Sequence, residues 1–236
     1  MGNAVLAAFV VVLLAVCAGL AFGVKVYVKP ISEIDRALAE LQATPLVGLA
    51  MKDNPEAAGV IRAAMEDDLR KPVAPGVPTR AFYAVGELSR DHIRPMLSAA
   101  DDGVVIAVMT ARYALVRHMR GVAPDKCRDF AMSTIQRIDS FDPESQGLFS
   151  TYLAAMETAY RNGRAAGGKP RPMPTAAEMV TMLGLTGFTQ DDLNALNRFA
   201  SLSAEQACDI EVKIDGALSR LPPEQRAPFS RFVLTH

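Results

Sequence analysis

The chain has 236 residues, half of them hydrophobic and 22% charged, and its formal net charge is −1. This near-neutral balance argues against a dedicated nucleic-acid binder, which is usually strongly basic. An aromatic content of 6%, with no tryptophan, argues against an aromatic sugar-binding platform. The chain beyond residue 28 is long enough to bury a core in one large domain or two small ones.

Residues 4–24 form an unbroken apolar run without a charged side chain. At about 1.5 Å per residue, a helix of roughly 21 residues spans about 31 Å, the thickness of a hydrocarbon core. The run is longer than the apolar region of a secretory signal, and only the terminal amine supplies positive charge before it. The sequence therefore predicts a single transmembrane helix within segment 1–28, with a lipid bilayer as its partner.

Small residues recur every four positions in this run, at Ala15, Gly19 and Gly23. Residues four apart share one helix face, so these three would form a flat surface where a second backbone can approach closely. The hypothesis is self-association through this packing face. The alternative is that glycine and alanine are simply common in membrane helices.

Two signals disagree on the side of the membrane that the rest of the chain occupies. Lys25, Lys29 and Arg36 follow the span and nothing basic precedes it, which favours a cytoplasmic domain. A long domain after an N-terminal anchor is, however, often translocated regardless of charge. The sequence does not decide between the two locations, and the extracytoplasmic location of the helical region is favoured.

The region after the span is expected to begin with membrane-proximal helices within 29–71. Lys29-Pro30 should end the span, because proline disfavours helix in the residue before it. A helix over 31–43 and a turn over 44–51 are expected to follow. Asn54-Pro55-Glu56 has the order of an N-cap, an N1 proline and a first-turn acid, which predicts a helix to about residue 70.

Residues 72–78 hold three prolines and a glycine, and predict an extended linker before a main helical domain over 79–236. The run that begins at Val104 could be a buried strand, but helix is favoured because no second strand exists to pair with it. The expected fold class is all-α: the transmembrane helix followed by a bundle-like soluble domain. Its main-domain helices are predicted at 79–99, 104–119, 123–138, 142–160, 175–183, 189–200, 203–221 and 222–233.

The stretch between residues 161 and 175 is predicted to be a flexible, solvated linker. Gly163 to Lys169 matches the spacing of a P-loop, but it follows a helix instead of a strand, and Pro170 replaces the residue that would hold Mg²⁺. Its basic side chains could instead contact anionic headgroups or an acidic partner. These side chains are Arg161, Arg164, Lys169 and Arg171.

No catalytic residue, cofactor site or metal site is predicted. His92, His118 and His236 are isolated in the sequence, and no HExxH motif is present. Asp91 could orient His92 for acid–base chemistry, but a surface histidine is the favoured interpretation. Glu211 borders an apolar helical stripe and is expected to reach solvent, since a desolvated carboxylate there would have a raised pKa.

Cys127 and Cys208 are the only cysteines after the apolar run. Outside the cytoplasm they could form one disulfide, which would close a loop of about 80 residues and stabilise the fold by roughly 4–5 kcal/mol. Two buried free thiols in a cytoplasmic domain are the alternative.

The favoured function is that of a membrane-anchored helical binding or scaffold protein, an accessory subunit of a membrane or envelope assembly. Such a module should expose an apolar patch or groove to a protein partner. One alternative is an envelope enzyme whose site is assembled only in three dimensions, which requires a cleft with converging ionisable residues. Another is a helical sensor of a small apolar ligand, which requires an enclosed apolar cavity.

Overall fold

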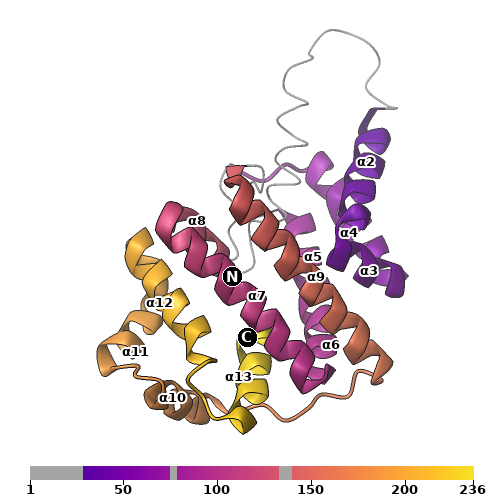
Figure 1. The fold of residues 1–236 in the computed structure, drawn as a ribbon. Helices are drawn as coiled ribbons and strands as arrows, with labels where there is room; N and C mark the ends of the chain where they lie inside the picture. Colours follow the sequence, from indigo (N-terminus) through magenta and orange to yellow (C-terminus); the bar gives the residue numbers. More distant parts are fainter. Residues whose placement is uncertain (1–28, 75–78, 133–139) are drawn as a thin grey trace. The chain divides into compact units, whose positions relative to one another are not determined.

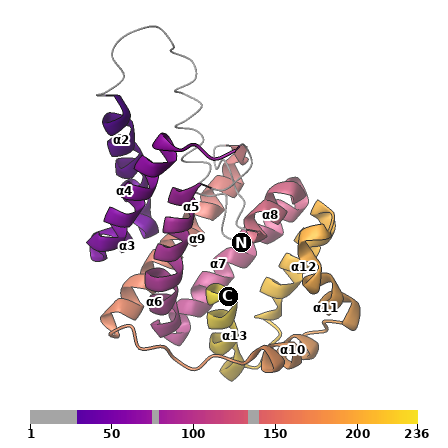
Figure 2. The ribbon, with the colours of Figure 1, turned by 180° about the vertical axis from the view of Figure 1, so that it is seen from behind.

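The computed structural model describes residues 29–74, 79–132 and 140–236, and every regular element in these ranges is a helix (Figures 1 and 2). The predicted all-α, bundle-like fold is confirmed for this part of the chain. The predicted transmembrane helix and its packing face at Ala15, Gly19 and Gly23 lie outside the described residues. Among the helices that are described, none combines the length and apolar character needed to cross a bilayer.

The described chain divides into two compact units, with the boundary between His92 and Ile93. The sequence instead predicts a boundary at the proline-rich linker 72–78. The helix after that linker, α5 (Arg80–Leu88), packs on α4 (Pro55–Arg70) before it. The carboxylate of Asp68 on α4 accepts hydrogen bonds from the backbone N–H groups of Arg80 and Ala81, at 3.0 and 2.9 Å. These bonds hold α5 in the first unit.

The first unit contains α2 (Lys29–Ala43), α3 (Pro45–Asp53), α4 and α5. Ile34, Leu38 and Leu41 are buried along one face of α2, as their spacing predicts. The turn predicted over 44–51 is wrong, because this segment is helix α3. Proline is well tolerated in the first turn of a helix, and Leu46, Ala50 and Met51 give α3 a buried face.

The predicted helix over 79–99 is interrupted by a π-helical turn, Ser89–Ile93, and continues as α6 (Arg94–Ala99). Pro95 has no backbone N–H, so a carbonyl in the preceding turn loses its usual helical donor. The π-helical turn lies directly before this break, as a single wide turn within a longer helix. Thr79 caps the N-terminus of α5 by accepting a hydrogen bond from the Phe82 N–H at 3.2 Å.

The second unit is arranged around α7 (Asp102–Val122), which lies between α9 (Pro143–Ala165) and α12 (Ala204–Ala217) in both views (Figures 1 and 2). Helix α8 (Pro124–Ala131) packs on α12, and α13 (Pro223–Thr235) packs on α6 and α7. The remaining helices of this unit are α10 (Ala176–Leu185) and α11 (Gln190–Asn197), followed by a 3₁₀ turn at Phe199–Ser201.

The segment that begins at Val104 is helical, as predicted. Val105, Val108 and Met109 have no exposed surface, and their spacing of three and four residues fits one face of a buried helix. Three helices of this unit have the N-caps that their sequences indicate. Asp142 accepts from the backbone of Glu144 and Ser145, while Thr175–Glu178 and Ser203–Gln206 form capping boxes. Asn54, the predicted N-cap of α4 in the first unit, makes no capping bond, and its side-chain amide donates to the Ala50 carbonyl at 2.8 Å. The predicted continuation of α8 over 133–138 lies outside the described residues.

Candidate functional site

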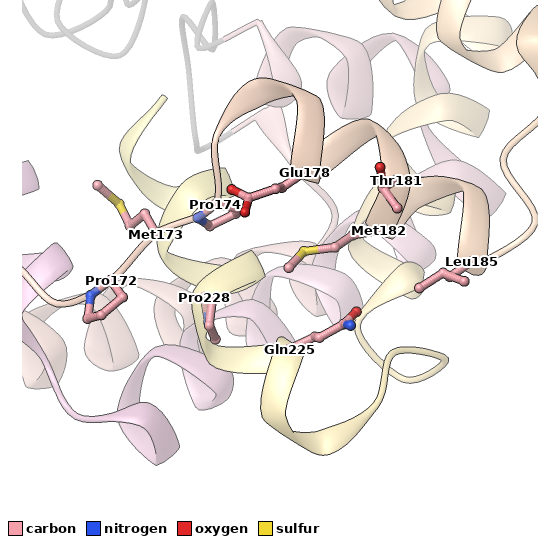
Figure 3. A pocket seen from close by; sticks show the side chains of 9 residues that line it. All are labelled: Pro172, Met173, Pro174, Glu178, Thr181, Met182, Leu185, Gln225 and Pro228. Atoms are coloured by element: carbon pink, nitrogen blue, oxygen red, sulfur yellow. The ribbon is translucent and has the colours of Figure 1, made fainter.

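An open, largely apolar groove of about 380 Å³ lies in the second unit, where α10, the segment before it and α13 meet. In Figure 3 the α10 side chains Met182 and Leu185 and the α13 side chains Gln225 and Pro228 border the same hollow. Its volume falls in the range of about 300–1,000 Å³ that is typical of ligand pockets. We call it the α10–α13 groove. Its lining residues are Pro172, Met173, Pro174, Glu178, Thr181, Met182, Leu185, Gln225 and Pro228.

The sequence of α10 explains how one short helix lines the groove and also joins the core. Met179 and Leu183, four residues apart, are buried in a cluster with Phe188 and Phe229. The groove is lined from another face of α10, by residues at positions i, i+3, i+4 and i+7 from Glu178. Leu185 is 62% exposed and Val180 is 48% exposed. Within α10 only Met179 and Leu183 are buried, so much of the surface of an apolar helix is exposed, which is unusual in a free monomer.

The carboxylate of Glu178 is ionised at the edge of the groove. It accepts hydrogen bonds from the backbone N–H and the hydroxyl of Thr175, at 2.7 and 2.8 Å. The backbone bond to Thr175, followed by the hydroxyl bond, lowers the pKa of Glu178. Glu178 therefore contributes a negative charge to the groove at neutral pH.

The wall of the groove at residues 172–174 is anchored through Arg171. The Arg171 backbone N–H donates to the Ser98 carbonyl at 3.1 Å, and its Nε donates to the Ala99 carbonyl at 3.2 Å. Its guanidinium also pairs with Asp101. The prediction of a solvated linker is therefore wrong at Arg171, because the carbonyls at the end of α6 and the carboxylate before α7 bind it. The Arg161 side chain pairs with Glu157 within α9.

A second hollow, of about 360 Å³, shares Pro172 and Pro228 with the α10–α13 groove. Arg231 lines it and is only 2% exposed. Its guanidinium donates to the Ala100 carbonyl at 2.8 Å and to Asp102 at 2.5 Å. Glu224 also lines this hollow. The two hollows together form one continuous surface along α13.

A buried ionic cluster lies elsewhere in the second unit, where Arg112 of α7 meets Glu211 and Asp215 of α12. Arg112 Nη1 lies 2.7 Å from Asp215 Oδ1, and its Nη2 pairs with Glu211. The expectation that Glu211 reaches solvent is wrong: the residue is 5% exposed, because the guanidinium compensates its charge inside the protein. A guanidinium on the neighbouring helix could not be anticipated from the pattern of α12 alone.

Burial disfavours the charged forms of both Asp215 and Arg112, but it outweighs the neighbouring charges only at Asp215. Desolvation, with a smaller effect from Glu211, raises the pKa of Asp215 to about 8, although Arg112 opposes the change. The two carboxylates raise the pKa of Arg112 despite its burial. Asp215 lines a cavity of about 230 Å³ between α7, α12 and Arg226, although its side chain has no exposed surface. The cluster thus pairs the Arg112 guanidinium with Glu211 and with an Asp215 carboxyl that is mostly protonated at neutral pH.

Cys127 of α8 and Cys208 of α12 are joined as a disulfide, with their Cα atoms 5.5 Å apart. Both residues are completely buried. Cys208 precedes Glu211 by three residues and Asp215 by seven, so all three occupy one face of α12. The same face of α12 therefore makes the covalent link to α8 and the ionic link to α7.

The glycines of the P-loop-like stretch have structural roles. A Cβ on Gly163 would lie 1.8 Å from the Met96 carbonyl oxygen, so glycine is required where α9 approaches α6. Gly167 and Gly168 have positive φ angles of 79° and 67° after the end of α9. In this position the stretch ends a helix, whereas a P-loop opens one.

Of the three histidines, His118 lies beside two carboxylates, and its Nδ1 is 3.5 Å from Glu144 Oε1. His118 Nε2 lies 3.1 Å from Asp142 Oδ1, while Asp91 pairs with Arg90 at 2.8 Å and does not orient His92. Hydrogen bonds from Ser145, with a smaller contribution from His118, hold the pKa of Asp142 well below its usual range. Within the described ranges, no group of three His, Cys, Asp or Glu side chains is arranged to hold a metal ion.

Comparison with protein-family models, curated proteins and solved structures finds no match for this chain. The features of this chain that can indicate a function are therefore the α10–α13 groove, the ionic cluster and the disulfide. The sequence did not single out the groove. Its signal is the composition of α10, where seven of the ten residues are Ala, Met, Val or Leu and only Glu178 is charged.

Proposed function

We propose that this chain is a membrane-anchored helical protein that binds a partner protein through the α10–α13 groove. The observation that carries the proposal is the exposed apolar surface at the groove, where Leu185 is 62% exposed and Met173 is 37% exposed. The other large apolar residues that are exposed in the described part of the second unit are Val180, which does not line the groove, and Val122. Exposed apolar side chains gathered around a concavity are typical of protein–protein contact sites.

Membrane attachment through the apolar run 4–24 is the second part of the proposal. It rests on the length of that run and on its lack of charge. The disulfide supports an extracytoplasmic location for the helical region, because disulfides persist in oxidising compartments and are rare in the cytosol. An accessory or scaffold role in an envelope assembly is consistent with both features.

The binding proposal is tested by affinity purification from detergent-solubilised membranes, with the matched variants Leu185→Glu and Val122→Glu. The two side chains are 62% and 57% exposed, so neither charge should disturb the core. We expect one reproducible partner with the parent chain and with Val122→Glu, and at least about tenfold less with Leu185→Glu, because the glutamate must be desolvated on binding. A monomeric native mass without a partner, or equal recovery with both variants, would contradict the proposal.

A further inference from the structure

The charges around the α10–α13 groove define the chemistry of its partner, given the proposed binding function. Two arginines lie at the second hollow, and aspartates compensate both: Arg171 pairs with Asp101, and Arg231 with Asp102. Glu178 and Glu224 make no ion pair in the described part of the chain, and each lines one of the two hollows. The surface along α13 is therefore apolar, and the two carboxylates at its edge have no cationic partner in the described part of the chain.

The shape of the groove favours a helical occupant. Its two principal walls are helices, since α10 contributes residues at i, i+3, i+4 and i+7, and α13 contributes Gln225 and Pro228. Residues three and four apart on one helix provide the spacing that receives the apolar side of another helix. Helix α10 has ten residues, so its contact with such an occupant extends over about three turns.

We propose that the α10–α13 groove receives an amphipathic helix of a partner protein, with its apolar side in the groove and Lys or Arg facing Glu178 and Glu224. The two carboxylates disfavour an anionic lipid surface, which recruits basic patches. They equally disfavour an acidic peptide, because like charges would be brought together on a partly desolvated surface. Met173 and Met182 give the groove unbranched side chains that can adapt to such a helix.

The test is photocrosslinking in native membranes with the full chain, using p-benzoylphenylalanine at Leu185 and, as a matched control, at Val122. The adduct is digested and its sequence read by mass spectrometry. We expect one segment of another protein, with apolar residues three or four apart and at least one Lys or Arg beside them. An adduct with lipid, with a second copy of this chain, or with an acidic or non-helical segment would overturn the inference.

The role of the two negative charges is tested separately, by introducing Glu178→Gln and Glu224→Gln together into the chain that carries p-benzoylphenylalanine at position 185. Glutamine at position 178 can retain the capping box with Thr175, so α10 should still form. We expect the adduct yield to fall at least about fivefold, and to be unchanged by Asp191→Asn on the neighbouring helix α11. An unchanged yield in the double variant would overturn the charge assignment and leave the groove as a binding site. Absence of any adduct above the Val122 control would overturn the proposed function as well.

Discussion

Arg112 donates a hydrogen bond to Asp215 in the interior of the second unit, with Nη1 and Oδ1 2.7 Å apart and no exposed surface on the Asp215 side chain. Glu211 shares the same guanidinium. A buried pair of this kind gives little net stability over an apolar replacement of the whole set, but loss of one partner leaves an uncompensated charge. The cluster therefore makes α7 and α12 strongly dependent on each other.

Arg112→Met should destabilise the protein by about 3–5 kcal/mol at pH 7, because it leaves the Glu211 carboxylate buried without a cation and removes the donor to Asp215. Urea denaturation followed by far-UV circular dichroism measures this change. Arg120→Met is the matched control on the same helix, since Arg120 makes an exposed pair with Asp209 and such pairs contribute little. Equal effects of the two variants would show that the Arg112 pairs are not important for stability.

The titration of Asp215 should make the free energy of unfolding decrease as pH rises from about 4 to 8. Burial raises the pKa of Asp215 to about 8, so over this range the folded state binds a proton that the unfolded state has released. Proton release on unfolding makes the free energy of unfolding fall with pH and level off above the folded pKa. The asparagine in Asp215→Asn cannot titrate, so this variant lacks the loss of stability that Asp215 causes in the parent chain. The difference in free energy of unfolding, variant minus parent, should therefore increase by about 2–5 kcal/mol between pH 4 and pH 8.

This comparison needs a control for the other groups that titrate between pH 4 and 8. Asp209→Asn serves, because Asp209 lies on the same helix and its side chain is 50% exposed. Its stability should follow that of the parent chain across the whole range. Parallel curves for Asp215→Asn and the parent chain would contradict the raised pKa.

Glycine-to-alanine changes at two positions of α9 should have opposite signs. Gly163→Ala places a Cβ 1.8 Å from the Met96 carbonyl oxygen, so the two helices must move apart and stability should fall by about 2 kcal/mol or more. A Cβ at Gly147 meets nothing within 4 Å, so Gly147→Ala should stabilise the helix by about 0.5–1 kcal/mol. Thermal denaturation of the two variants measures both effects, and a tolerated Gly163→Ala would disprove the close approach of α9 to α6.

Ser203→Ala should destabilise the protein by about 1 kcal/mol, because the Ser203 hydroxyl accepts the hydrogen bond of the Gln206 N–H that opens α12. Thr158→Ala is the control, since that hydroxyl is exposed and donates within its own helix to the Ala154 carbonyl. We expect the control to change stability little in the same urea titration. A Ser203→Ala variant as stable as the control would mean that the capping box is not important.

The sequence predicts the local features of this fold well, because they depend on residues close together in the chain. The capping box at Thr175–Glu178 and the N-cap at Asp142 follow from side chains within three positions of each other. The burial of Glu211 depends on Arg112, 99 residues away in the chain. No helical periodicity in α12 contains that information.

The groove was missed for a related reason. The apolar residues of α10 suggest a buried helix, and only the packing of Met179 and Leu183 shows which side remains open. The turn predicted over 44–51 is wrong because Pro45 is compatible with a helix at its position. In the structure it occupies the first turn of α3, where its missing N–H is not needed.

The most direct test of the account is labelling of Cys127 and Cys208 in intact cells with a membrane-impermeant thiol reagent, in a Cys17→Ala background. Labelling is compared with and without prior reduction. It is repeated in denaturant, because both sulfurs are buried and a folded domain would shield them from the reagent. The account predicts labelling from outside the cell only after reduction, as expected for an anchored extracytoplasmic domain closed by a disulfide. Labelling without reductant, and only after the cells are lysed, would place the domain in the cytoplasm with free thiols and contradict it.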